Sequence, residues 1–418
     1  MNSNYKQFLS IMSTLNHCNL NKNRITSIDA LRGFALFGIL MIHCIERFDL
    51  DFQPVIDSPF WEKIDKLTFH SIDFIFGGKS YAIFSLLFGL GFFIQMESQK
   101  SRGTDFRLRF LWRLALLFTL GFLYALIYTG DFFRIYAITG IILIPLYKAP
   151  TKWLILIAIL LLLQLPEIFW FVSSLRGETI EGVTTFISQI DDIYIRSAEV
   201  FIHGSFWDVL HFNLKEGQLV TFYWSFGEAR YPQMIGLFIL GMLIGRSGIY
   251  KDEKKIILYS RKVLPYSIAC SVIFKVTLLS LPFINIKGME LIYGDMLFSA
   301  YANLSMGVMY ISVFMLLYHT TKNQNWIEKI APFGRMSVTN YVMAGLICVP
   351  LFYGYGFNLA VQLSYLQSCL IGLVIFAFQV LFSNWWIKQY YFGPFEWLWR
   401  SCTWLKFVPL KRKATNTP

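Results

Sequence analysis

The feature that most constrains this chain is the number and length of its apolar runs. A hydrocarbon core about 30 Å thick requires roughly 20 apolar residues per helix. Of the 418 residues, 56% are hydrophobic and only 15% are charged, which is far from the usual composition of soluble domains. The sequence therefore predicts an all-α, polytopic helical membrane protein. About ten runs are suitable: 31–48, 80–97, 110–129, 132–147, 153–174, 232–247, 263–283, 296–318, 336–354 and 362–382.

The charges between these runs predict a topology. If the N-terminus is cytoplasmic, the inner segments carry 26 Lys and Arg against 7 Asp and Glu, and the outer segments carry 10 against 19. Positive residues accumulate on the cytoplasmic side of spanning helices. The pattern predicts ten helices with the N-terminus and the C-terminus cytoplasmic. The net charge of +11 then faces anionic membrane lipid and does not indicate a nucleic-acid partner.

Three regions follow from this topology. Residues 1–24 are expected to form a cytoplasmic tail, and residues 25–383 a transmembrane helical domain. That domain includes an acidic outer loop, 175–230, which is long enough for amphipathic helices. Residues 384–418 begin with a stretch that mixes Trp and Tyr with Lys and Arg. This composition is typical of the headgroup region and predicts a cytoplasmic, amphipathic, aromatic-rich C-terminal segment.

The first apolar run contains ionisable residues at membrane depth. Arg32 and His43 are eleven residues apart, so they share one helix face about 16 Å apart along the axis. Asp29 lies on the same side. Ionisable groups at this depth usually face a cavity or a partner. Two interpretations remain open here. The three residues could form a functional site, or Asp29 and Arg32 could be a structural ion pair while His43 bonds to a neighbouring helix.

Other polar residues give weaker indications. Asp131 and Arg134 have the spacing of an ion pair at a helix start or, less often, of a substrate contact. Lys275 lies inside an apolar run, where a structural and a transport role are equally open. His203 and His211 do not have a standard metal spacing, so no metal site is assigned.

Two short motifs favour structural roles. The sequence GGKS at 77–80 lacks the earlier glycine of a phosphate loop, and its glycines are expected to let the chain turn into the second run. Glu396 is four residues before Arg400, a spacing that predicts an acid–base pair on a helix that docks at the inner face.

Several longer motifs together resemble one family. In order, they are RITSIDALRGFALFGIL (24–40), GGKSYAIFSLLFGLGF (77–92), GDFFRIYAITGIIL (130–143), FGRMSVTNY (333–341) and FGPFEWLWR (392–400). Their order is similar to that in the YeiB-like family, bacterial proteins defined by domain of unknown function 418. This resemblance implies a multi-pass protein of the bacterial cytoplasmic (inner) membrane and supplies no agreed activity.

The opening helix is also similar to that of transmembrane acyltransferases of the cell envelope, in which an Arg and a His are separated by ten residues. Arg32 and His43 match this spacing. The resemblance implies that His43 is a catalytic base. Arg32 would hold the phosphates of an acyl-CoA donor and Asp29 would orient Arg32. The other expected substrate or donor contacts are Asp131, Arg134, Arg335 and Asn340.

The sequence thus favours an enzyme that moves an acyl group from acyl-CoA, a donor substrate and not a bound cofactor, to an envelope glycan, lipid or metabolite. The alternative is a transporter that moves a small solute or lipid through a polar cavity built from the same residues. A non-catalytic scaffold would leave the polar face of the first helix unexplained. The donor, the acceptor and the oligomeric state stay open.

Overall fold

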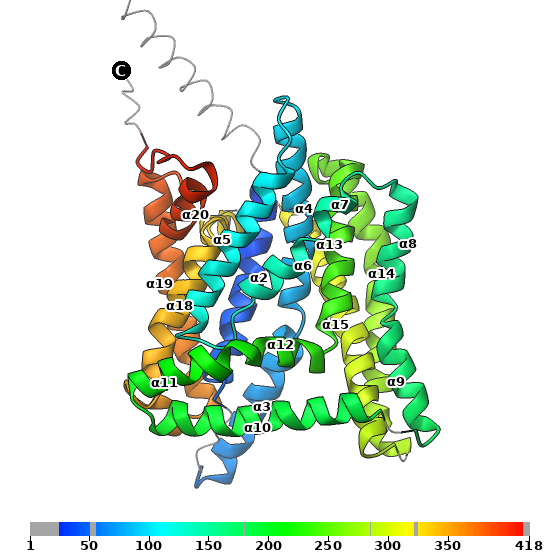
Figure 1. Ribbon diagram of the computed structural model, residues 1–418, viewed down its shortest axis with the longest axis vertical. Helices are drawn as coiled ribbons and strands as arrows, with labels where there is room; N and C mark the ends of the chain where they lie inside the picture. Colours follow the sequence, from blue (N-terminus) through cyan, green and yellow to red (C-terminus); the bar gives the residue numbers. More distant parts are fainter. Residues whose placement is uncertain (1–24, 51–55, 179, 285, 322–324, 413–418) are drawn as a thin grey trace, which may run out of the picture.

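The computed structural model describes residues 25–50, 56–178, 180–284, 286–321 and 325–412, and this part of the chain is helical, with no strand (Figure 1). The predicted tail 1–24 lies outside the described residues. The all-α prediction is confirmed. The first half contains α2 (Thr26–Ile45), α3 (Pro59–Phe76), α4 (Ser80–Lys100), α5 (Arg107–Ala125), α6 (Phe133–Gly140), α7 (Leu143–Leu146), α8 (Thr151–Leu162), α9 (Leu165–Leu175) and α10 (Glu181–His203).

The second half continues the bundle. It contains α11 (Phe206–Phe212), α12 (Gln218–Gly227), α13 (Arg230–Ser247), α14 (Glu253–Ser280), α15 (Met289–Thr320), α16 (Asn325–Glu328), α17 (Ala331–Arg335), α18 (Ser337–Phe352), α19 (Tyr365–Gln389) and α20 (Pro394–Trp404). Short turns of other helix types lie at Asn213–Gly217, Ile249–Lys251, Leu281–Ile284 and Leu359–Val361.

Among the described residues, seven helical stretches are long and apolar enough to cross a membrane. They are Thr26–Ile45, Pro59–Lys100, Arg107–Ala125, Thr151–Leu175, Glu253–Ile284, Met289–Thr320 and Tyr365–Gln389. The other three expected runs form helices that are shorter or have polar ends, namely α6 with α7, α13 and α18. The chain is therefore a multi-helix membrane protein, while the count of ten and the cytoplasmic ends stay predictions.

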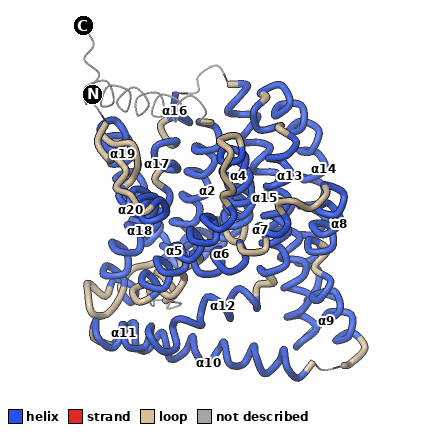
Figure 2. Tube along the Cα trace, turned by 45° about the horizontal axis from the view of Figure 1, so that its top comes forward, coloured by secondary structure: helices blue, strands red, loops and turns tan. Residues whose placement is uncertain are grey.

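The segment 175–230, which is predicted to be on the outer side, is mostly helical in its described residues. In Figure 1, α10 lies across one end of the bundle, close to α11 and α12, and α20 lies at the opposite end. The tube view in Figure 2 shows the same crossing of α10 beneath the other helices. The predicted segment 384–418 starts inside a helix, because α19 continues to Gln389 before α20 begins.

Glycines allow the closest helix contacts. A Cβ at Gly241 of α13 would collide with the backbone of Leu86 in α4, and a Cβ at Gly89 would collide with Phe238. Small residues let membrane helices approach in this way. At the other side of the bundle, Gly33 of α2 lies against Gly334 of α17 with no room for a side chain on either residue. These contacts fix the frame in which the polar residues lie.

Candidate functional site

The helices enclose one large cavity of about 2000 Å³. Arg32 and His43 both line it, so one face of α2 extends along the cavity, as the helical spacing predicts. Asp191 and Tyr194 of α10 line the same cavity near the end of the bundle that carries the outer segment. The cavity therefore brings together polar residues that are distant in the sequence.

One imidazole nitrogen of His43 is hydrogen-bonded, and the other has no hydrogen-bond partner among the described residues. Its Nδ1 lies 2.8 Å from the hydroxyl oxygen of Tyr128 and 3.9 Å from the carboxylate of Glu46. Its Nε2 is buried and has no hydrogen-bond partner in the described part of the chain. The His43 residue lines the cavity, and an imidazole with one nitrogen not engaged in a hydrogen bond is a candidate general base.

Asp49 extends this arrangement. Its carboxylate accepts a hydrogen bond of 2.6 Å from the Thr129 hydroxyl and one of 3.4 Å from the Tyr128 hydroxyl. The three residues Asp49, Tyr128 and His43 thus form a connected chain of polar groups. Sequence reasoning missed Asp49 and Tyr128, because the connection crosses from the end of α2 to the segment after α5.

The backbone that carries Asp49 is strained. Arg47, Phe48 and Asp49 have φ values of 49°, 58° and 71°, a left-handed conformation that non-glycine residues rarely adopt. Each such residue costs on the order of 1–3 kcal/mol and persists when its surroundings hold it. Here the Tyr353 hydroxyl donates to the Phe48 carbonyl at 3.0 Å, and the Arg47 guanidinium donates to the Leu363 carbonyl at 3.0 Å. This turn directs Asp49 back towards Thr129.

Burial affects the carboxyl groups next to His43. It raises the pKa of Asp49, while the hydrogen bond from Thr129 and the charge of His43 act in the opposite direction. The pKa of Glu46 is also raised by removal from bulk water, although its side chain still faces the cavity. Elevated carboxyl pKa values beside an imidazole are typical of functional sites.

At the other end of α2, arginines line the cavity. Arg32 donates to the carboxylate of Asp29 at 3.2 Å, and Asp29 itself lies outside the cavity lining. Arg335 lines the cavity and donates to the Tyr391 carbonyl. Gly33 and Gly334 are the sequence neighbours of Arg32 and Arg335, and their close contact brings the backbone of α17 against that of α2 at this point.

Two further residues line the cavity at this end of α2, and sequence reasoning did not assign them to a site. Arg113 of α5 lies with its guanidinium carbon 4.1 Å from the centre of the Trp399 ring, and both residues line the cavity. The Trp399 indole donates to the Arg113 carbonyl at 3.1 Å. The position of Arg113 near the start of an apolar helix was the available signal, but its partner could not be read from the sequence.

Glu396 joins α20 to the start of α18. Its carboxylate accepts from the backbone amides of Val338 and Thr339 at 2.7 and 3.1 Å, and from the Thr339 hydroxyl at 2.5 Å. Burial raises the pKa of Glu396 against the effect of these hydrogen bonds. Glu396 therefore supplies the amides at the first turn of α18 with an acceptor from another helix.

Three expected contacts lie outside the lining of the large cavity. Asp131 and Arg134 are buried and form an ion pair of 3.5 Å, and Arg134 also donates to the side chain of Gln218 at 2.5 Å. The buried amide of Asn340 donates to the Phe333 carbonyl and to the Ser383 hydroxyl, at 2.9 Å each. These bonds connect helices, so the geometry favours the structural interpretation of all three residues.

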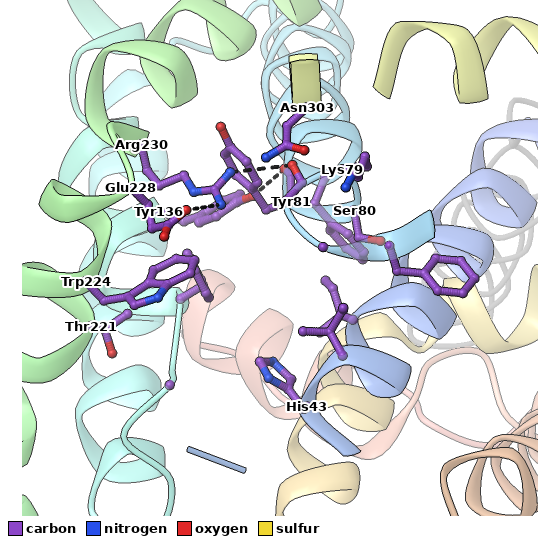
Figure 3. A pocket seen from close by; sticks show the side chains of 18 of the residues that line it. His43, Lys79, Ser80, Tyr81, Tyr136, Thr221, Trp224, Glu228, Arg230 and Asn303 are labelled. Atoms are coloured by element: carbon purple, nitrogen blue, oxygen red, sulfur yellow. Dashed lines mark hydrogen bonds and ion pairs between the residues drawn. The ribbon is translucent and has the colours of Figure 1, made fainter. Parts of the chain in front are cut away.

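Another group of charged residues lines the cavity (Figure 3). The guanidinium carbon of Arg230 lies 4.2 Å from the Tyr81 ring centre and 5.1 Å from that of Trp224. Arg230 also pairs with the carboxylate of Glu228 at 3.0 Å. Lys79 of the GGKS motif is buried beside it, at the turn where Gly78 has a φ of +72°. The predicted turn is present, and Lys79 faces inward.

His203 lies at the end of α10, and Asp208 and His211 lie on α11. Asp208 and Ser205 form a reciprocal cap at the start of α11. Across the described ranges, the structure contains no group of three or more potential metal-binding His, Cys, Asp or Glu side chains.

Comparisons with known proteins agree with the motif-based resemblance. Residues 244–406 match the family model described as "Protein of unknown function (DUF418)". The chain is 28% identical to "Uncharacterized protein YxaH" of Bacillus subtilis, covering 94% of this chain and 98% of that protein. It is 27% identical to "Uncharacterized protein YeiB" of Escherichia coli, covering 91% and 96% of the two chains. The predicted resemblance to the YeiB-like family is confirmed.

Proposed function

We propose that this chain, a relative of the YeiB-like proteins with a family segment of unknown function, is a transmembrane acyltransferase of the bacterial cytoplasmic membrane. The single observation that supports the proposal best is the state of His43. Its Nδ1 is held by Tyr128, and its buried Nε2 has no partner at the wall of a cavity that also contains Arg32.

In the proposed reaction, the acceptor is a hydroxyl or amine of an envelope glycan, lipid or metabolite. His43 Nε2 takes the acceptor proton while the acceptor oxygen or nitrogen attacks the acyl carbon of the thioester. The carbon–sulfur bond then breaks, the acyl group stays on the acceptor, and the proton passes from His43 to the leaving thiolate. Tyr128 and Asp49 act as positioning residues, because they fix the imidazole through Nδ1.

The donor is proposed to enter at the end that contains Arg32, Arg113 and Arg335. Guanidinium groups suit phosphate groups, which they bind through paired hydrogen bonds. Three arginines and the carboxylate of Glu396 line this part of the cavity, which leaves an excess of positive charge for an acyl-CoA donor. An extended donor would span the roughly 16 Å between Arg32 and His43.

The test is transfer of labelled acetyl from acetyl-CoA into an envelope fraction by membranes that contain the protein. We expect transfer with the wild type and with the control His70→Ala, because His70 is exposed on α3 outside the cavity lining. His43→Ala should lower the rate by about 10²–10⁴-fold. Tyr128→Phe should lower kcat with little change in the KM for the donor. Equal rates for the wild type and His43→Ala would contradict the assignment of the base.

Transport of a small solute or lipid is the second candidate. The observation that favours it is the continuity of the cavity, which is lined both by Arg335 next to α18 and by Asp191 of α10. Tight binding of acetyl-CoA by the purified protein would favour the enzyme. Absence of both binding and transfer would favour the transporter.

A further inference from the structure

The apolar span Thr151–Leu175 is interrupted inside the protein. The helix α8 ends at Leu162 and α9 begins at Leu165, and Gln164 between them has a φ of 52°. Gln164 is buried, and its side-chain amide nitrogen donates to the Ala229 carbonyl at 2.9 Å. Its side-chain oxygen Oε1 is buried without a hydrogen-bond partner among the described residues. The interruption therefore presents an acceptor oxygen to the protein interior.

Glu167 presents a second acceptor at the same place. Gln164 is the N-cap of α9 and Glu167 is its third residue, and the groups at these two positions of a helix lie close together. Glu167 is 3% exposed, and its Oε2 is buried without a hydrogen-bond partner in the described part of the chain. No lysine, arginine or histidine among the described residues forms an ion pair with it. A buried carboxylate is costly unless a cation compensates its charge.

Gln233 of α13 presents a third acceptor. Its side-chain amide nitrogen donates to the Ala300 carbonyl of α15 at 2.7 Å, and its Oε1 is buried without a hydrogen-bond partner within the described ranges. The amide nitrogens of Gln164 and Gln233 each have a carbonyl acceptor of their own. The atom left without a partner is therefore the oxygen in both side chains, and what these oxygens lack is a positive charge or a donor.

Contacts of α13 place Gln233 beside the interruption. On one side of it in the sequence, the Ala229 carbonyl accepts from Gln164. On the other side, a Cβ at Gly236 would lie 2.8 Å from the side chain of Leu162. Gly236 is three residues after Gln233, and this spacing puts both residues on the same side of α13. Gln233 therefore faces the segment that joins α8 to α9.

The helix α15 encloses the same region. The Tyr301 hydroxyl donates to the Leu163 carbonyl at 2.5 Å, and Tyr301 follows Ala300, which accepts from Gln233. The carboxyl group of Glu167 is within electrostatic range of the Tyr301 hydroxyl. The three acceptor oxygens are thus gathered where α8, α9, α13 and α15 meet.

We infer that the oxygens of Gln164, Glu167 and Gln233 bind an alkali-metal cation. Carboxylate and amide oxygens are the ligands that hard cations prefer. One carboxylate among neutral oxygens balances a single positive charge, whereas a divalent ion would leave one charge uncompensated. Interrupted helices supply monovalent-cation sites in membrane proteins in general. The three residues lie outside the lining of the large cavity, so cation binding does not depend on the acyl-transfer chemistry proposed above.

The test is binding of radioactive sodium, and of radioactive rubidium as an analogue of potassium, to the purified full chain in detergent. We expect saturable binding of one of these ions to the wild type. Glu167→Gln keeps the size of the side chain and removes its charge, so it should weaken this binding by about tenfold or more. Gln233→Met removes a neutral oxygen and should weaken it less. The melting temperature of the wild type should rise when the chloride of the bound ion replaces choline chloride.

The matched control is Glu178→Gln, which changes an exposed acid just beyond α9 and should bind like the wild type. Size-exclusion profiles verify that each variant folds. The inference is overturned if neither ion binds saturably, or if Glu167→Gln binds as tightly as the control. Either result would mean that Glu167 is neutralised by a proton or that water alone satisfies the three oxygens. Since the assay contains no acetyl-CoA, its outcome is separate from that of the transfer assay.

Discussion

At the scale of single residues, the expected site residues fall into two groups, those that line the cavity and those that do not. Arg32, His43 and Arg335 line it, while Asp29 supports Arg32 from outside the lining. Asp131, Arg134 and Asn340 instead form buried contacts between helices. The sequence could not make this distinction, because an ion pair and a substrate contact require the same residue types at the same spacing.

Arg32→Ala should weaken donor binding more than it slows chemistry. Removal of a charged hydrogen-bonding group costs about 1.5–3 kcal/mol, or roughly ten- to a hundredfold in affinity. We expect the KM for acetyl-CoA to rise by that factor with kcat changed much less, measured by labelled acetyl transfer. Arg261→Ala, an exposed arginine of α14, is the control. A drop confined to kcat would place Arg32 away from the donor.

Asp49 gives a prediction for pH. Burial raises its pKa in the folded protein above the ordinary value of 3.8, so the folded state binds more protons than the unfolded state between the two values. The contribution of Asp49 to stability therefore increases as the pH falls through this window. The melting temperature of the wild type should rise relative to that of Asp49→Asn as the pH is lowered from 7 towards 4. A constant difference would contradict the raised pKa.

At the scale of elements, α18 begins where α20 supplies an acceptor. An N-terminal helix turn leaves backbone amides without partners, and Glu396 accepts from two of them at the end of the bundle that carries α20. The contact of Glu396 with α18 therefore says more about how α20 docks on the bundle than the predicted pairing of Glu396 with Arg400. Local spacing indicated a docking helix, but the receiving surface lies more than fifty residues earlier in the chain.

Glu396→Ala should destabilise the junction of α18 and α20 by about 1–3 kcal/mol, because it leaves buried amides unsatisfied. Glu396→Gln retains one acceptor and should cost less. The measurement is the unfolding midpoint of the detergent-solubilised protein, with Glu199→Gln on the exposed face of α10 as the control. If Glu396→Ala unfolds at the same midpoint as the control, the carboxylate does not stabilise this junction.

At the scale of the whole molecule, segments that the charge pattern assigns to opposite sides of the membrane lie at opposite ends of the bundle, while the orientation itself stays a prediction. The start of α5, with Arg107, Arg109 and Arg113, lies at the same end as α20, and α10 lies at the other (Figure 1). Because Arg32 and His43 line the cavity at opposite ends of α2, the topology would decide which compartment supplies the proposed donor.

The topology can be tested with single cysteines in a background from which the native cysteines are removed. Arg102→Cys, between α4 and α5, should react with a membrane-impermeant maleimide only after the inner face is opened. Glu178→Cys, between α9 and α10, should react in intact cells. The opposite pattern would show that the protein has the reverse orientation in the membrane, with the arginine-lined end of the cavity outside.

Composition and apolar runs alone determined that this chain is a helical membrane protein, because a bilayer leaves few other structures for a chain so apolar. The spacing of Arg32 and His43 likewise placed both on one helix face, since the geometry of an α-helix is fixed. Only the tertiary structure could show that Tyr128 contacts both His43 and Asp49, that Gly334 packs against Gly33, and that Lys79 and Lys275 line one cavity. These relations depend on packing between distant segments, and no local pattern records which helices become neighbours.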